Sequence, residues 1–149
     1  MTYQLPFDGH REPQPSPYHE TSSWLKYCLD FAMPIGTPVL AIADGEVIMV
    51  RKGYCKNYTT PKHADRTNIV QIKHKNGNVS LYGHLKSVMV KKGQIVVAGT
   101  QIGESGDVGY ATYPHLHFGL YNDEGNNIIY ESDYVIFPVR RDKTIKTIY

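Results

Sequence analysis

Apolar and polar side chains alternate over short segments of the chain, a pattern typical of half-buried β-strands. In residues 27–32, Tyr27, Leu29 and Phe31 fall on one face and the side chains between them on the other. Similar segments are 39–43, 46–51, 68–74, 78–84, 94–97, 100–104, 113–121 and 128–130. No stretch of ten or more residues keeps a helical apolar stripe. We therefore expect an all-β fold of short antiparallel strands, packed as a β-sandwich or a folded stack of hairpins.

Turn and loop signals separate these strands. The dipeptide Asp44-Gly45 predicts a tight hairpin, and residues 75–77 predict a second one. Residues 52–67 are polar and irregular, which indicates a long loop of the kind that often borders a functional site. Residues 1–23 hold four prolines and no sustained period, so they form an irregular N-terminal arm. We expect a single domain over 1–149, made of this arm, a β core over 24–138 and a C-terminal tail over 139–149.

The composition fits one compact domain, because 149 residues with 41% hydrophobic side chains can build a single core. A net charge of +2 is too mild for nucleic acid, and the basic clusters at 91–92 and 140–143 are expected to be solvated. No apolar run has the length of a membrane span, and the given N-terminus lacks the apolar core of a signal peptide. We expect a monomer. Cys28 and Cys55 either form one disulfide or stay as thiols.

The run 113–121 contains a His-x-His motif. Alternation places His115 and His117 on one face of the predicted strand, with Gly119 and Tyr121, and three apolar side chains on the other face. Imidazole is the commonest protein ligand of zinc and the usual general base near neutral pH. The pair therefore predicts a metal ligand, a base, or one of each, although a half-buried strand with two polar residues explains it equally well.

Two further residues carry chemistry. Asp30 lies between Leu29 and Phe31, and a buried carboxylate needs a cation or several hydrogen-bond donors to offset its desolvation. His84 is predicted to share the polar face of its strand with Tyr82, near the strand end. Taken alone, His84 is better explained as a residue that caps a hairpin or bonds a loop carbonyl.

Several linked blocks occur in order between Asp30 and Phe118, over about 60% of the chain. They are 30–39, Ala41, Asp44-Gly45, Val47, 82–85, Gly93, Gly99, Ile102-Gly103, Gly106, Gly109 and 114–118. Together they resemble the blocks of the lysostaphin-type zinc metalloendopeptidases, which cut peptidoglycan cross-bridges. The resemblance implies a β fold of the duplicated-hybrid-motif type, with an active-site groove over an antiparallel sheet and one Zn²⁺ per chain.

The resemblance also assigns roles position by position. Asp30 matches the family's aspartate ligand, and His117 matches its last histidine ligand. His84 and His115 match two catalytic histidines that flank the reacting water and the substrate carbonyl. Two histidines and one carboxylate leave a coordination position for water, which zinc makes more acidic.

The first histidine ligand is the point of departure from the family. The commonest pattern places it four residues before the aspartate, where this chain has Lys26, and a protonated amine is a poor zinc ligand. A related subset places the histidine farther upstream, and residues 17–19 resemble that arrangement. We therefore expect His19 to be the first ligand, with His10 as the reserve.

The remaining candidates are weaker. His74 shares a face with apolar residues and is expected to be a packed structural histidine, and His63 is expected to be solvated in its loop. Tyr82 and Asn68 are candidates for binding substrate in the groove, and Asn68 is equally plausible as a turn-bonding residue. Cys28 is expected to be only a neighbour of Asp30.

Two classes of function follow. The first is a zinc endopeptidase that acts on peptidoglycan peptides, and it implies secretion or a place in the cell envelope. The second is a catalytically inactive domain of the same fold that binds the cell wall or activates other wall hydrolases. A third, more distant reading is a lipoyl-carrier or sugar-phosphotransfer domain, which the spacing at 90–103 resembles, but no lysine sits at a suitable hairpin tip.

Overall fold

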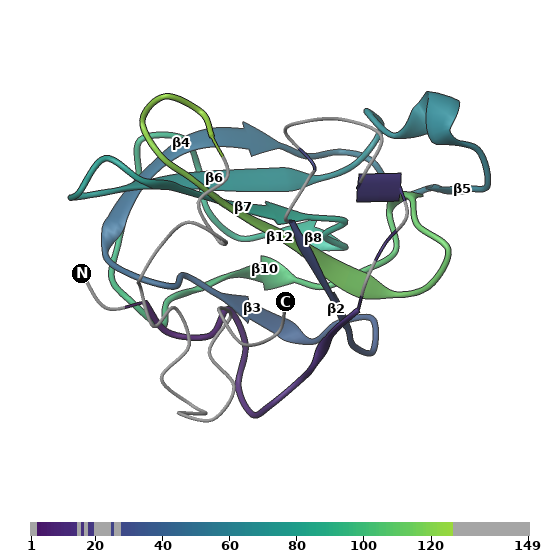
Figure 1. Ribbon diagram of the computed structural model, residues 1–149, viewed down its shortest axis with the longest axis horizontal. Coiled ribbons are helices and arrows are strands. Elements are labelled where there is room, and N and C mark those ends of the chain that lie inside the picture. The colour runs from purple at the N-terminus through teal and green to yellow at the C-terminus, as the bar shows by residue number, and fades with distance from the viewer. Residues whose placement is uncertain (1–2, 15, 17, 20–24, 26–27, 127–149) are drawn as a thin grey trace.

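The computed structural model describes residues 3–14, 16, 18–19, 25 and 28–126 (Figure 1). Its elements are β1 (Pro13–Gln14), β2 (Leu29–Ala32), β3 (Pro38–Leu40), β4 (Gly45–Arg51), β5 (Asn57–Tyr58), the 3-10 turn η2 (Pro61–His63), β6 (Ile69–His74), β7 (Val79–Gly83), β8 (Ser87–Val88), β9 (Ile95–Val96), β10 (Gln101–Glu104), β11 (Gly109–Tyr110) and β12 (His115–Tyr121). The all-β prediction is confirmed. The predicted strand at 128–130 and the tail at 139–149 lie outside the described residues.

A seven-stranded antiparallel sheet forms the centre of the fold, with the strand order β1-β2-β12-β7-β6-β4-β9. Strand β12 lies between β2 and β7, so the His-x-His strand pairs with the strand that carries Asp30 (Figure 1). The hairpin predicted at residues 75–77 is confirmed, because β6 and β7 pair across it. Among the described residues, no helix is long and apolar enough to cross a membrane.

The hairpin predicted at Asp44-Gly45 is wrong. Strand β3 pairs with β10 in a second sheet of order β3-β10-β8, whereas β4 belongs to the seven-stranded sheet. One edge of β4 pairs with β6, and on the other edge β9 pairs with Gly45 and Glu46, the positions next to the turn where a tight hairpin with β3 would have to begin. The turn therefore carries the chain from one sheet to the other.

The main core fills the space between these two sheets. Leu116, Phe118 and Leu120 of β12 are buried there, as the alternation predicted, and they pack in one cluster with Val39 and Ile102 of the smaller sheet. The opposite face of the seven-stranded sheet carries His115, His117 and Tyr121. This face holds only a small apolar cluster of Cys28, Ile69, Leu81 and Tyr121, with Met49 packed against it. One face of the sheet therefore packs and the other is available for chemistry.

The predicted loop at 52–67 contains β5 and η2, and β5 pairs in parallel with β11. The side chain of Asn57 reinforces this pairing by donating to the carbonyls of Asp107, at 2.7 Å, and Ala111, at 2.9 Å. The loop is thereby held against the segment that leads into β12. Both segments contribute residues to the cavity described next.

Candidate active site

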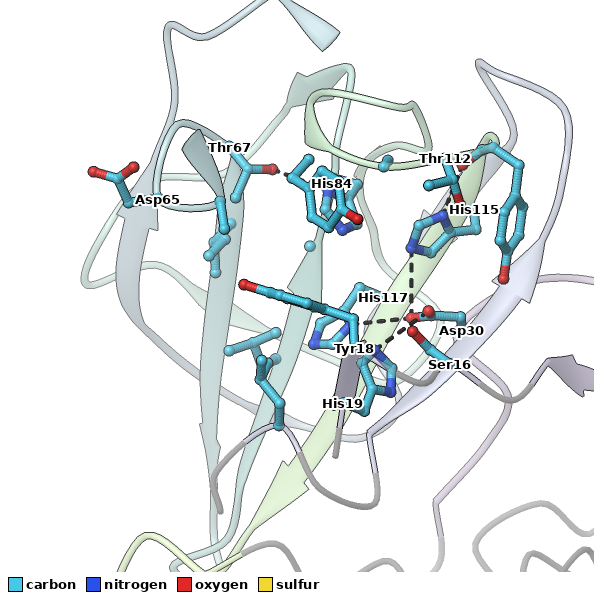
Figure 2. Close-up of a pocket in the computed structure, with 18 of the residues that line it drawn as sticks. Ser16, Tyr18, His19, Asp30, Asp65, Thr67, His84, Thr112, His115 and His117 are labelled. Atoms are coloured by element: carbon cyan, nitrogen blue, oxygen red, sulfur yellow. Dashed lines mark hydrogen bonds and ion pairs between the residues drawn. The ribbon is translucent and has the colours of Figure 1, made fainter. Parts of the chain in front are cut away.

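Strand register brings the central residues of the site together. His117 lies opposite Asp30 on one side and opposite Gly83 on the other. A Cβ atom added to Gly83 would lie 3.4 Å from the Cβ of His117, in ordinary van der Waals contact, so the two positions are direct neighbours on the sheet surface. The three positions form the floor of a cavity of about 550 Å³, which Figure 2 shows.

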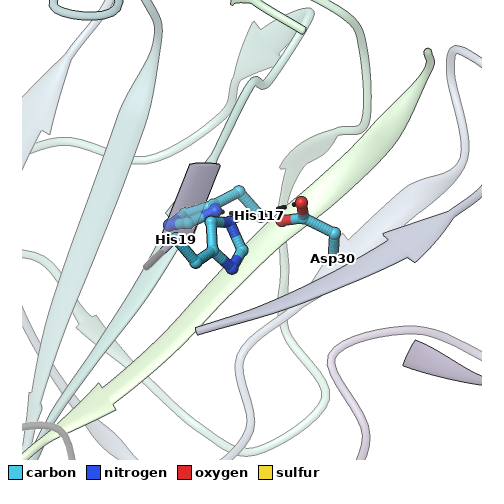
Figure 3. Close-up of side chains that lie close together, drawn as sticks. All are labelled: His19, Asp30 and His117. Atoms are coloured by element: carbon cyan, nitrogen blue, oxygen red, sulfur yellow. Dashed lines mark hydrogen bonds and ion pairs between the residues drawn. The ribbon is translucent and has the colours of Figure 1, made fainter. Parts of the chain in front are cut away.

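Three potential metal ligands meet on this floor, one each from His19, Asp30 and His117. One donor atom from each lies within 4.8 Å of the other two (Figure 3). Nε2 of His19 lies 3.3 Å from one carboxylate oxygen of Asp30, and Nδ1 of His117 lies 3.0 Å from the other. All three side chains are buried. His10 lies elsewhere, exposed and paired with Glu12, so the geometry brings together His19 and not the reserve residue.

The charge of Asp30 is maintained despite its burial. Burial raises the pKa of the carboxyl, but hydrogen bonds from His117 and His19 outweigh this effect and hold the pKa well below its usual range. Burial lowers the pKa of His117, yet the Cys28 thiol and the Asp30 carboxylate together raise it to about 10. The centre therefore attracts positive charge, which a proton on His117 supplies when no metal is bound.

The donor set fits Zn²⁺. Nδ1 of His19 donates to the carbonyl of Cys28 at 3.0 Å, so its Nε2, which faces the Asp30 carboxylate, can interact favourably with it only through a second proton on the ring or through a cation. Two acceptors that face each other in a buried site repel unless a cation lies between them. Two imidazoles and one carboxylate make a three-residue set that is typical of catalytic zinc sites.

His84 and His115 border the same centre with a common orientation. Nδ1 of His84 donates to the carbonyl of Val108 at 2.8 Å, and Nδ1 of His115 donates to the carbonyl of Tyr113 at 2.8 Å. These bonds fix the tautomer, so both rings turn the lone pair of Nε2 away from those carbonyls (Figure 2). Nε2 of His115 lies 3.5 Å from Asp30, and the two rings are 4.6 Å apart.

Both of these histidines are neutral at pH 7. Burial, with the nearby His115 and His117 rings, holds the pKa of His84 at about 3. Burial also lowers the pKa of His115, although Asp30 acts in the opposite direction. Each neutral ring therefore presents a proton acceptor to the cavity.

The backbone at His84 explains an error in the predicted faces. His84 has φ of 60°, the only positive φ at a non-glycine position among the described residues. The left-handed conformation reverses the alternation after β7, so His84 faces the cavity while Leu85 turns into the core. Tyr82, predicted to share a face with His84, is instead fully buried on the core side.

The prediction that Tyr82 and Asn68 line the groove is therefore wrong. The Tyr82 hydroxyl accepts from the backbone N–H of Ile42 at 3.1 Å, deep in the core. The Asn68 amide is buried and donates to the carbonyls of Tyr54 and Leu85, both at 2.8 Å, which is the turn-bonding alternative. Neither side chain lines the cavity.

The other candidates take structural places. His74 is buried, as predicted, with Nδ1 donating to the carbonyl of Asp44 at 2.9 Å. His63 packs against the Tyr58 ring in the loop, with centroids 4.4 Å apart, and does not line the cavity. Cys28 and Cys55 are not joined by a disulfide, and the thiol of Cys28 lies 3.1 Å from the Tyr121 hydroxyl.

Sequence reasoning missed several groove residues. Tyr18, Arg51 and Tyr113 line the cavity, and the Tyr113 hydroxyl is buried without a hydrogen-bond partner among the described residues. Burial, with the charge of Asp30, raises the pKa of Tyr113 to about 12. Arg51 could have been found from alternation along β4, because Met49 packs on the groove face two residues earlier.

Comparison with known proteins places this arrangement in a family. The profile of peptidase family M23 matches residues 25–128. The peptidoglycan DD-endopeptidase ShyA of Vibrio cholerae is 46% identical over 91 residues, which cover 61% of this chain and 19% of ShyA. The chain thus spans about a fifth of the length of the first curated relatives that it matches.

Solved structures agree with the sequence comparison. The catalytic domain of lysostaphin from Staphylococcus simulans superposes with a TM-score of 0.55 and 35% identity, covering 76% of this chain and 77% of that domain. A zinc-containing peptidase from Vibrio cholerae superposes with a TM-score of 0.57 and 32% identity, covering 84% of this chain and 35% of that protein. The family match covers most of the chain and includes the strands that carry Asp30, His84, His115 and His117. The chain therefore belongs to peptidase family M23.

Proposed function

We propose that this chain is a zinc-dependent endopeptidase that hydrolyses peptide cross-links of bacterial peptidoglycan. In this proposal His19, Asp30 and His117 hold Zn²⁺, and His84 and His115 transfer protons. The observation that carries it is the meeting of three ligand atoms within 4.8 Å beside two neutral imidazoles that border the same cavity. The name of the relative ShyA supports peptidoglycan as the substrate.

A bound zinc ion supplies Lewis-acid polarisation of a peptide carbonyl and makes water more acidic. The protein supplies the positions of the proton carriers. Val108 and Tyr113 hold the rings of His84 and His115 in one tautomer, so that Nε2 is the atom that accepts a proton from water. The ring that has gained this proton then becomes a donor to the departing amine or to the carbonyl oxygen.

The surroundings strengthen this chemistry. The His115 ring and the Asp30 carboxylate are buried, the His84 ring is half-buried, and the segment 110–113 lines the cavity beside them. Electrostatic interactions are stronger in such a dry site than in water. Activity on peptidoglycan also implies that the protein acts outside the cytoplasm or in the envelope, and one site per chain is consistent with a monomer.

The test combines metal analysis with hydrolysis. We expect the purified protein to hold one zinc per chain and to cleave purified cross-linked wall peptides. His19→Ala should lose most of its zinc, whereas His10→Ala, a histidine of the same N-terminal segment, should keep it. Zinc retained in His19→Ala would refute the choice of ligand, and zinc-loaded protein that cleaves no wall peptide would favour the cell-wall-binding alternative.

A further inference from the structure

The positively charged side chain of Arg51 lies on the same row of residues, paired across neighbouring strands, as the metal ligands Asp30 and His117. Register pairs His117 with Gly83 and Arg51 with Ile69, and continuing the β6–β7 register places Ile69 opposite Gly83. The row on the groove face therefore runs from Asp30 to Arg51 across five strands. Three steps of about 4.8 Å put Arg51 about 14 Å from His117, which an extended peptide spans in about four residues.

Within the described part of the chain, Arg51 is not paired with an anion. Its side chain lines the cavity and is half-buried, and its Nε is buried without a hydrogen-bond partner. No carboxylate among the described residues lies within 4.0 Å of its guanidinium, since the ion pairs there involve histidines only. A half-buried guanidinium has the donors for a bidentate carboxylate, and it gains most from one where water is partly excluded.

The chain next to Arg51 is strongly basic. Residues 51–66 hold five Lys and Arg and one acidic residue, Asp65, a balance of +4 in a chain whose total is +2. Part of this segment, at 64–65, lines the cavity. Asp65 is exposed at the cavity and forms no ion pair with Arg51. This side of the groove therefore attracts anions rather than neutral chains.

We propose that Arg51 binds a free carboxylate of the substrate, within about four residues of the bond that is cut, so that the groove selects acidic wall peptides over an uncharged glycine bridge. This inference rests on the proposed function and adds the substrate class. The chain matches both a DD-endopeptidase and a glycyl-glycine endopeptidase. A carboxylate site at Arg51 would favour substrates of the first kind over those of the second.

The test uses one cross-linked wall peptide in two forms, with free carboxylates and with those groups converted to carboxamides. For the zinc-loaded wild type we expect KM for the carboxylate form to be roughly 10- to 100-fold lower, as for a charge-assisted hydrogen bond. Arg51→Gln should remove this preference by raising KM for the carboxylate form alone, with kcat little changed. Arg51→Lys should recover part of it, because the charge remains and the bidentate geometry is lost.

Lys52→Gln is the matched control, because it removes one charge from the next residue, which is exposed and outside the cavity. Its KM should change less than about twofold, as expected for a screened surface charge. Zinc content and melting temperature of each variant verify folding. An equal rise of KM for both peptides in Arg51→Gln, or faster cleavage of oligoglycine than of the carboxylate peptide by the wild type, would overturn the inference.

Calorimetric binding of the same two peptides separates the two proposals. Binding that favours the carboxylate form and depends on Arg51, without hydrolysis, would support the inference and count against the endopeptidase. Hydrolysis with no preference between the two forms would leave the endopeptidase standing and refute the role of Arg51.

Discussion

Two buried polar networks lie on opposite faces of the seven-stranded sheet, and each contains histidine. On the core face, His74 contacts the Ser80 hydroxyl at 2.8 Å, and Ser80 contacts the Tyr82 hydroxyl at 3.0 Å. This series of hydrogen bonds ends on backbone groups, because His74 donates to the carbonyl of Asp44 and the Tyr82 hydroxyl accepts from the N–H of Ile42. Each polar side-chain atom in this core network has a partner.

The groove network also contains buried histidines, but not every polar side-chain atom in it has a hydrogen-bond partner among the described residues. His117 Nε2 is buried without a partner among the described residues, and the rings of His19 and His115 both turn Nε2 towards Asp30. The difference shows that a buried histidine is structural when donors and acceptors match, and a candidate ligand when acceptors converge. Mutations in the two networks should therefore change different measured quantities.

The largest effect is expected from Asp30→Asn, which keeps the shape of the side chain and removes its charge. Zinc content should fall to near zero and kcat/KM by roughly 10³-fold or more, because the site loses the one carboxylate among its three described ligand residues. Metal analysis and peptide hydrolysis measure both. In the core network, His74→Gln should keep its zinc, and metal loss in that variant would remove the distinction between the networks.

His84→Gly should lower kcat by about 10²-fold or more and leave zinc bound, because His84 transfers protons without holding the metal. Glycine also tolerates the φ of 60°, so this variant should be more stable than His84→Ala by about 1 kcal/mol. Kinetics and thermal melting test the two parts separately. If His84→Gly loses zinc, His84 belongs with the ligands.

Chelation should act on the groove network alone. If zinc at 100 times its Kd stabilises the fold by about 2.7 kcal/mol, EDTA should lower Tm by roughly 5–10 °C. The Tm of Asp30→Asn, which has already lost the metal, should not respond. An equal drop in both proteins would mean that EDTA acts elsewhere.

Ser80→Ala should cost about 1–3 kcal/mol of unfolding free energy with no change in zinc content or kcat. The substitution leaves His74 Nε2 and the Tyr82 hydroxyl each without one buried partner. Denaturant unfolding measures the loss. A fall in kcat at unchanged zinc content would show that the two faces of the sheet are coupled.

The smallest expected effect is the loss of folding stability at acid pH that results from protonation of His74. Burial lowers the pKa of His74 below 6.5, so the unfolded chain binds more protons there than the folded protein as the pH falls below 6.5. The stability contributed by neutral His74 is complete above pH 6.5 and is lost below it, with a slope of at most about 1.4 kcal/mol per pH unit. Unfolding curves of the wild type and His74→Gln between pH 7.5 and 5 should converge, and parallel curves would contradict the titration.

Much of the groove could be predicted from sequence because alternation is a local property. The period of two residues placed His115 and His117 on the face opposite Leu116, and the cost of burying a carboxylate singled out Asp30. The resemblance to the lysostaphin-type endopeptidases added His19, which the structure brings beside Asp30 from an N-terminal arm that has no periodic pattern.

The wrong predictions concern side-chain faces and strand pairings that depend on a long-range contact or on a single backbone angle. A positive φ turns His84 to the face opposite Tyr82, and no local pattern of side chains indicates such an angle at a histidine. Strand β3 does not form the predicted hairpin with β4, because β9, about fifty residues farther along the chain, pairs with the start of β4. Alternation along β4 could have placed Arg51 on the groove face, but its alignment with the metal ligands depends on register across other strands.

The pairing of β2 with β12 also has a consequence for how the protein folds. His117 and Asp30 are 87 residues apart in the chain, and closing a loop of that length costs on the order of 4 kcal/mol of chain entropy. Ligands that join such distant segments form late in folding, because contacts of high sequence separation are slow to establish. A metal ion bound by both Asp30 and His117 would cross-link β2 and β12. It would therefore stabilise the strand pairing that is slowest to form without it.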